Sequence, residues 1–199
     1  MARDLLTKVC AAQGNDVHLL LDKYTSPSIK DIERSNRGEI NHGITFVISG
    51  PNQIQRLSGA DLLRISSFKD QFGRFIMEEW AKPHYGTIIG DKVIYVSYGG
   101  MCMRYMNMVE TGKSQYKVDY PPMFQGKHEE ADTLIAFHCN LVGNGKITVR
   151  SSDTDVIVIL LNLAHKLTAC EVIIDYGAGI NRRFINVSGI YLYILLNSI

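Results

Sequence analysis

The stretch KITVRSSDTDVIVILLNLAHKLTACEVII (residues 146–174) decides the fold. Its apolar pattern predicts a strand over 146–150, a helix over 154–166 and a second strand over 171–174. The run Ile147-Thr148-Val149 is typical of a buried strand. Strand, helix and strand in this order predict two parallel strands covered by a helix. We therefore expect an α/β fold with a mainly parallel central sheet and helices on both faces.

The segments around this stretch extend the same alternation. A helix is expected over 129–141, followed by the turn Gly143-Asn144-Gly145. Earlier in the chain the pattern predicts strands over 16–22 and 44–49, a helix over 27–37, an amphipathic helix over 59–80, two strands within 87–105 joined by Gly99-Gly100, and a loop over 113–125.

The composition is that of a globular protein with an ordinary core. The chain has 199 residues, of which 46% are hydrophobic and 21% are charged, and one domain over 1–199 is the expectation. The formal net charge is +1, so an attraction to DNA or RNA would have to come from a local basic patch.

The cysteines and the apolar runs indicate the cellular compartment of the protein and whether it has a membrane segment. The four cysteines are widely spaced, without a Cys-x-x-Cys pair or a preceding signal peptide, which favours reduced thiols and an intracellular protein, nuclear or cytoplasmic. The longest apolar runs, 156–161 and 191–196, are far shorter than the ~20 residues that span a bilayer. We expect no membrane segment.

Two acidic phrases stand where helices are expected to begin: His128-Glu129-Glu130-Ala131-Asp132 and Ser152-Asp153-Thr154-Asp155. Crowded carboxylates repel one another, and a cation between them offsets that cost. Oxygen ligands of this kind suit Mg²⁺ or Mn²⁺. The alternative is helix capping by Ser152 or Asp153, with Glu129 and Glu130 at the positive end of their helix.

The spacing of the first phrase limits which acids can share an ion. Glu130 and Asp132 are two residues apart, so on a regular helix their side chains would point about 200° from each other. Either Glu130 lies in an irregular first turn, or Glu129 and Asp132, three apart, form the pair. Further acids at expected strand ends are Asp22 and Asp175, at the edge where ligands of parallel sheets collect.

The helix expected over 27–37 carries cations on one face. Lys30, Arg34 and Arg37 are spaced four and three apart, a spacing that suits binding of a nucleic-acid phosphate. A solvated face neutralised by Asp31 and Glu33 is the alternative.

Read in chain order, these segments resemble the PIN-like domain of the flap endonuclease superfamily. In that family a strand-end Asp, a Glu-x-Glu or Glu-x-Asp at a helix start and an Asp-x-Asp after a strand bind two divalent metals. The matching residues, which the resemblance implies are metal ligands and catalytic, are Asp22, Glu130, Asp132, Asp153 and Asp155. Lys30 and Arg37 match the family's basic residues near the scissile phosphate. The resemblance implies a three-layer, Rossmann-like fold, two Mg²⁺ or Mn²⁺ ions and hydrolysis of DNA or RNA.

A closer resemblance covers most of the chain. The phrases at 21–34, 128–133, 149–156 and 174–179 are similar to those of uncharacterised, repeat-like animal gene products, which bring no established activity.

The chain departs from the flap-type pattern in two places. The family's acid on an earlier strand has no match before Asp16. Its later acid, which in the animal group lies in a Gly-Cys-Asp-Thr-Thr phrase, has no match before Ile199. On the resemblance, the chain is a fragment truncated at both ends. A catalytically incomplete module that binds nucleic acid or protein is one alternative.

A haloacid-dehalogenase-like phosphatase is the other alternative. There the first Asp of the phrase 152–156 would attack phosphorus and the second would act as acid. That motif opens its domain, whereas here it lies at three quarters of the chain.

Overall fold

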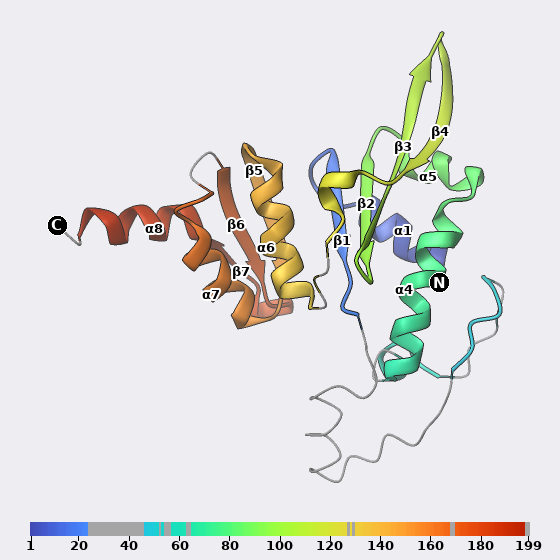
Figure 1. Ribbon diagram of the computed structural model, residues 1–199. Coiled ribbons are helices and arrows are strands. Elements are labelled where there is room, and N and C mark those ends of the chain that lie inside the picture. Colours follow the sequence, from blue (N-terminus) through green and yellow to red (C-terminus); the bar gives the residue numbers. More distant parts are fainter. Residues whose placement is uncertain are drawn as a thin grey trace. The chain divides into compact units, whose positions relative to one another are not determined.

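The computed structural model divides the chain into two compact units, Met1–Lys127 and His128–Ile199. Each unit contains a small sheet with helices (Figure 1). The structure describes residues 1–23, 46–51, 53, 57–62, 65–126, 128, 130–167 and 170–197.

The sheet of the first unit is mixed. Strand β1 (Asp16–Leu20) runs parallel to β2 (Val93–Tyr98), which is followed by the antiparallel strands β3 (Met101–Glu110) and β4 (Lys113–Asp119) in the order β1-β2-β3-β4. The β2–β3 turn is Gly99-Gly100, and both residues have positive φ (61° and 89°), which glycine adopts without strain. Because β2 pairs only with the first half of β3, the β3–β4 hairpin extends beyond β2 (Figure 1).

The helices of this unit bury one apolar core. They are α1 (Ala2–Cys10), α3 (Gly59–Leu62), α4 (Ser66–Trp80) and α5 (Gly86–Ile89), with 3-10 turns η1 (Pro83–Tyr85) and η2 (Pro122–Phe124). Leu6, Ile76 and Trp80 are fully buried against Ile94 and Val96 of β2. The residue types in the core are those that gain most from leaving water.

The second unit is built on the stretch that opened the sequence analysis. Its elements are α6 (Ala131–Val142), β5 (Gly145–Ser151), α7 (Thr154–Leu163), β6 (Cys170–Tyr176), η3 (Gly179–Asn181), β7 (Arg183–Asn186) and α8 (Val187–Leu196). The sheet has the order β5-β6-β7, with β5 and β6 parallel and β7 antiparallel to β6. The predicted strand–helix–strand unit is thus confirmed.

The register of this sheet separates an apolar from a polar face. Val149 of β5 pairs with Ile174 of β6, which pairs with Ile185 of β7, and all three contribute to one core with α6, α7 and α8. Successive residues of a strand point to opposite faces. The neighbouring row, Arg150, Asp175 and Phe184, therefore lies on the other face.

The prediction of a mainly parallel sheet is wrong for the strands that the structure describes. Only β1–β2 and β5–β6 are parallel; β2–β3, β3–β4 and β6–β7 are antiparallel. The segment 113–125 was expected to be a loop, but it contains β4. Its Tyr116 and Val118 alternate onto the first core, a short period-two pattern that the surrounding polar residues obscure. The three-layer arrangement of a PIN-like domain stays a prediction.

Other predictions hold in part. The helix expected over 59–80 is interrupted, since Ile65 has extended backbone (φ −89°, ψ 114°) before α4 begins. Residues 46–49 form no strand, and the Phe46 and Ile48 amides instead donate to side chains of α4 (Ser67 Oγ, 3.2 Å; Gln71 Oε1, 2.9 Å). The helix predicted over 27–37 lies outside the described residues.

Helix α8 was not predicted, because its composition gives no amphipathic pattern. Five consecutive residues of this helix, Leu192–Leu196, are exposed apolar side chains. It has ten residues, and none of the helices in the part of the chain that the structure describes is long and apolar enough to cross a membrane.

Candidate metal centre

Three of the predicted acids converge at the start of two helices in the second unit. Each of Asp132, Asp153 and Asp155 has a carboxylate oxygen that lies within 4.8 Å of a carboxylate oxygen of the other two. Asp132 is half-buried, and the other two are exposed. We call these residues the aspartate triad.

Helix α7 fixes two members of the triad through its own N-terminal capping. The Ser151 hydroxyl oxygen at the end of β5 accepts a hydrogen bond from the Asp153 amide (3.0 Å). Asp153 is the N-cap, and its Oδ1 accepts from the Asp155 amide (2.9 Å). These bonds hold the Asp153 side chain and the backbone at Asp155 next to the carboxyl end of β5, the edge at which ligands of parallel strands bind.

Helix α6 supplies the third member. Its N-cap, Glu130, has extended backbone (φ −100°, ψ 139°), and Asp132 follows in the first helical turn. Helices α6 and α7 pack together in one core, with Ala136 and Cys139 beside Val156 and Leu160. Tertiary packing thus brings a carboxylate of α6 to those of α7.

The other predicted ligands are not part of this triad. Glu130 is exposed, is the N-cap of α6 and makes no capping hydrogen bond through its side chain. Whether Glu129 or Glu130 pairs with Asp132 stays open, as in the sequence analysis. Glu129, Lys30, Arg34 and Arg37 lie outside the described residues. Asp22 lies two residues after Leu20, the last residue of β1, in the first unit, and its role as a ligand stays a prediction.

The triad combines negative charge with hard oxygen atoms. Three carboxylates at two helix N-termini gain from the positive ends of the helix dipoles, which lowers the cost of crowding them. Capping preference alone explains an acid at each helix start, but not the convergence of acids from two helices. An oxygen-only donor set of this charge suits Mg²⁺ or Mn²⁺.

Asp175, the other acid at the end of β6, has a different role that the sequence analysis missed. It is 6% exposed and receives two hydrogen bonds from Arg182 (Nε to Oδ1, 2.7 Å; Nη2 to Oδ2, 2.8 Å) and one from Arg150 Nη1 to Oδ1 (2.8 Å). Hydrogen bonding by Arg182, aided by the charge of Arg150, holds the pKa of Asp175 below its usual range. Spacing along the chain gives no signal for this pair, because Arg150 lies opposite Asp175 only through the register of β5 and β6.

We expect Asp175→Asn to destabilise the protein by about 2 kcal/mol at pH 7, because hydrogen bonds from charged groups to a buried carboxylate are lost. The pKa of Asp175 is lower in the folded than in the unfolded protein, so its stabilisation is present above the unfolded value of about 3.9 and declines as the pH falls through the folded value. Urea denaturation followed by circular dichroism should show a difference from wild type at pH 7 that shrinks below about pH 4. A pH-independent difference would contradict this account.

No protein-family model matches the chain, and no curated protein or solved structure matches it either.

Proposed function

We propose that this chain is a PIN-like, metal-dependent nuclease that hydrolyses phosphodiester bonds of DNA or RNA. The observation that carries the proposal is the convergence of Asp132, Asp153 and Asp155 from two helix starts within 4.8 Å. These are three of the five acids in the flap-endonuclease pattern; Asp153 and Asp155 follow the parallel strand β5, and Asp132 lies in the first turn of α6.

The proposal gives each group a role. Asp153 and Asp155 would be the main ligands of the ions, with Asp132 and Glu130 completing their coordination, in part through water. Asp22, in the first unit, is a ligand on the resemblance alone. When bound, two divalent ions supply activation of a water and stabilisation of the leaving oxygen. Lys30, Arg34 and Arg37 would hold phosphates of the substrate. The fold that goes with these roles is the three-layer PIN-like arrangement.

A cleavage assay with purified protein tests the proposal. Single-stranded, flapped and duplex oligonucleotides of DNA and RNA are incubated with Mg²⁺ or Mn²⁺, and in parallel with EDTA. We expect cleavage of at least one substrate with metal and none with EDTA. Two further readouts do not depend on cleavage. Calorimetric titration with Mn²⁺ measures metal binding directly, and bound metal should also raise the melting temperature of the protein.

The outcomes separate the alternatives. Absence of cleavage under all conditions would contradict the nuclease, and binding of the same oligonucleotides without cleavage would identify a catalytically incomplete binding module. Hydrolysis of small phosphate monoesters without cleavage of polymers would favour the phosphatase alternative.

A further inference from the structure

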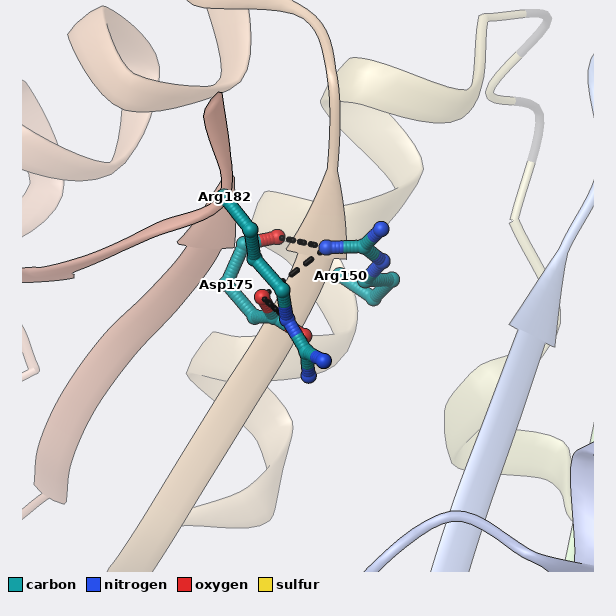
Figure 2. Close-up of polar contacts among 3 residues, drawn as sticks. All are labelled: Arg150, Asp175 and Arg182. Atoms are coloured by element: carbon teal, nitrogen blue, oxygen red, sulfur yellow. Dashed lines mark hydrogen bonds and ion pairs between the residues drawn. The ribbon is translucent and has the colours of Figure 1, made fainter. Parts of the chain in front are cut away.

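The polar face of the second unit's sheet carries two exposed arginines that share one buried acid. Arg150 and Arg182 approach Asp175 together, as Figure 2 shows, and their side chains are 53% and 52% exposed, against 8% for Asp175. One carboxylate between two guanidinium groups leaves one positive charge on this surface. We call the three residues and Phe184 the arginine clamp.

The bonds to Asp175 orient the guanidinium groups but leave many of their donors available. Arg182 uses Nε and Nη2, and Arg150 uses only Nη1, which also donates to the Asp175 carbonyl oxygen (3.2 Å). A guanidinium carries five N–H donors. The others have no acceptor among the residues that the structure describes, so they can bind an external anion at little cost in side-chain entropy.

Phe184 adds an exposed aromatic ring to the same face. It pairs with Asp175 across β6 and β7, so the two side chains share the face of the sheet. The ring is 65% exposed, and the Arg182 guanidinium carbon lies 5.3 Å from its centroid, within cation–π distance. An exposed ring beside arginine donors is the combination with which proteins bind single strands, in which phosphates contact cations and bases stack on aromatic faces.

The clamp lies close in the sheet to the aspartate triad. Arg150 is the residue before Ser151, the last of β5, and Ser151 holds the Asp153 amide. The main-chain bond from Gly177 to Ser151 (3.3 Å) ties the end of β6 to the same edge. Positive donors and a carboxylate cluster thus occupy neighbouring positions at the carboxyl end of the parallel strands.

We propose that the arginine clamp binds a single-stranded segment of nucleic acid, with phosphates on Arg150 and Arg182 and a base stacked on Phe184. The inference rests on the proposed function, since it names the form of the substrate. It adds a binding surface that the acidic pattern did not indicate.

Fluorescence anisotropy in EDTA tests the clamp without any contribution from metal. The probes are labelled oligothymidylate and oligouridylate of about 12 nucleotides, a length within the range that single-strand binding folds cover, and a duplex of the same length. Wild type should bind the single strands more tightly than the duplex, because only an unpaired base can stack on Phe184.

Three substitutions locate the binding surface. Arg150→Gln leaves the two bonds from Arg182 to Asp175 in place and should weaken binding about fivefold to tenfold, with a salt slope reduced by about 0.7 for the lost phosphate contact. Phe184→Ala, at a side chain outside the core, should weaken single-strand binding about tenfold. Arg183→Gln is the matched control: it removes the same charge from an exposed neighbour that alternation places on the opposite face, and should change affinity less than twofold.

Two results would contradict binding by the clamp. One is an equal loss of single-strand affinity in Arg183→Gln and Arg150→Gln, and the other is wild-type affinity in both Arg150→Gln and Phe184→Ala. Circular dichroism of each variant excludes unfolding as the cause. Cleavage that persists while the clamp variants bind normally would leave the proposed function standing without this inference. Binding that depends on the clamp residues in a protein that cleaves none of the substrates would support the clamp and contradict the nuclease.

Discussion

Asp153→Asn should reduce metal-dependent cleavage at least about 100-fold, as should Asp155→Asn. Removing one carboxylate from the triad removes a negative ligand, and a loss of about 3 kcal/mol in transition-state stabilisation corresponds to about two orders of magnitude in rate. Asparagine caps helices as well as aspartate does, so Asp153→Asn keeps an acceptor oxygen for the hydrogen bond that the Asp155 amide donates, and with it the start of α7. The measurement is the single-turnover cleavage rate at saturating Mn²⁺.

Asp4→Asn is the matched control for these variants. Asp4 is likewise an exposed acid in the first turn of a helix, but in α1 of the first unit. The Asp4→Asn variant should cleave at the wild-type rate. Undiminished cleavage in both triad variants would show that the activity comes from another site or a contaminant, and the same loss in Asp4→Asn would show a general effect of charge.

Trp80→Ala should lower the free energy of unfolding by about 3–5 kcal/mol, the range for deletion of a large buried aromatic side chain. Trp80 is fully buried in the first core. Its ring packs edge-to-face against Tyr105, with centroids 6.4 Å apart, and its Nε1 donates to the Ala2 carbonyl oxygen of α1 (3.1 Å). The substitution leaves a cavity and a buried carbonyl without its donor. Chemical denaturation followed by circular dichroism measures the loss.

Two further variants show how much of the lost free energy of unfolding comes from the packing of the Trp80 side chain. Trp80→Phe keeps most of the buried apolar area but not the N–H donor, so it should be less destabilised than Trp80→Ala. Val109→Ala truncates an apolar side chain that is 75% exposed on β3 and should change stability by less than about 0.5 kcal/mol. A loss below about 1 kcal/mol in Trp80→Ala would contradict the assignment of Trp80 to the core.

Some residues of the candidate site can be predicted from the sequence pattern, and others cannot. Asp153 and Asp155 could be placed because their positions follow from one strand ending and one helix beginning within a few residues. Glu130 could not be separated from Asp132 in this way, since the direction of a side chain in the first turn depends on the cap geometry. The Asp175 ion pairs depend on the register between β5 and β6, which spacing along the chain does not specify.

The sequence by itself determined the elements whose patterns are local: β1, the β2–β3 turn at Gly99-Gly100, and the α6–β5–α7–β6 alternation with its acidic helix starts. Only the tertiary structure decided the pairing of β4, the antiparallel addition of β7, the convergence of the aspartate triad and the arginine clamp. The physical reason is that backbone preference and hydrophobic period act over a few residues. Strand register and the packing of α6 on α7 depend instead on how whole apolar faces are buried against one another.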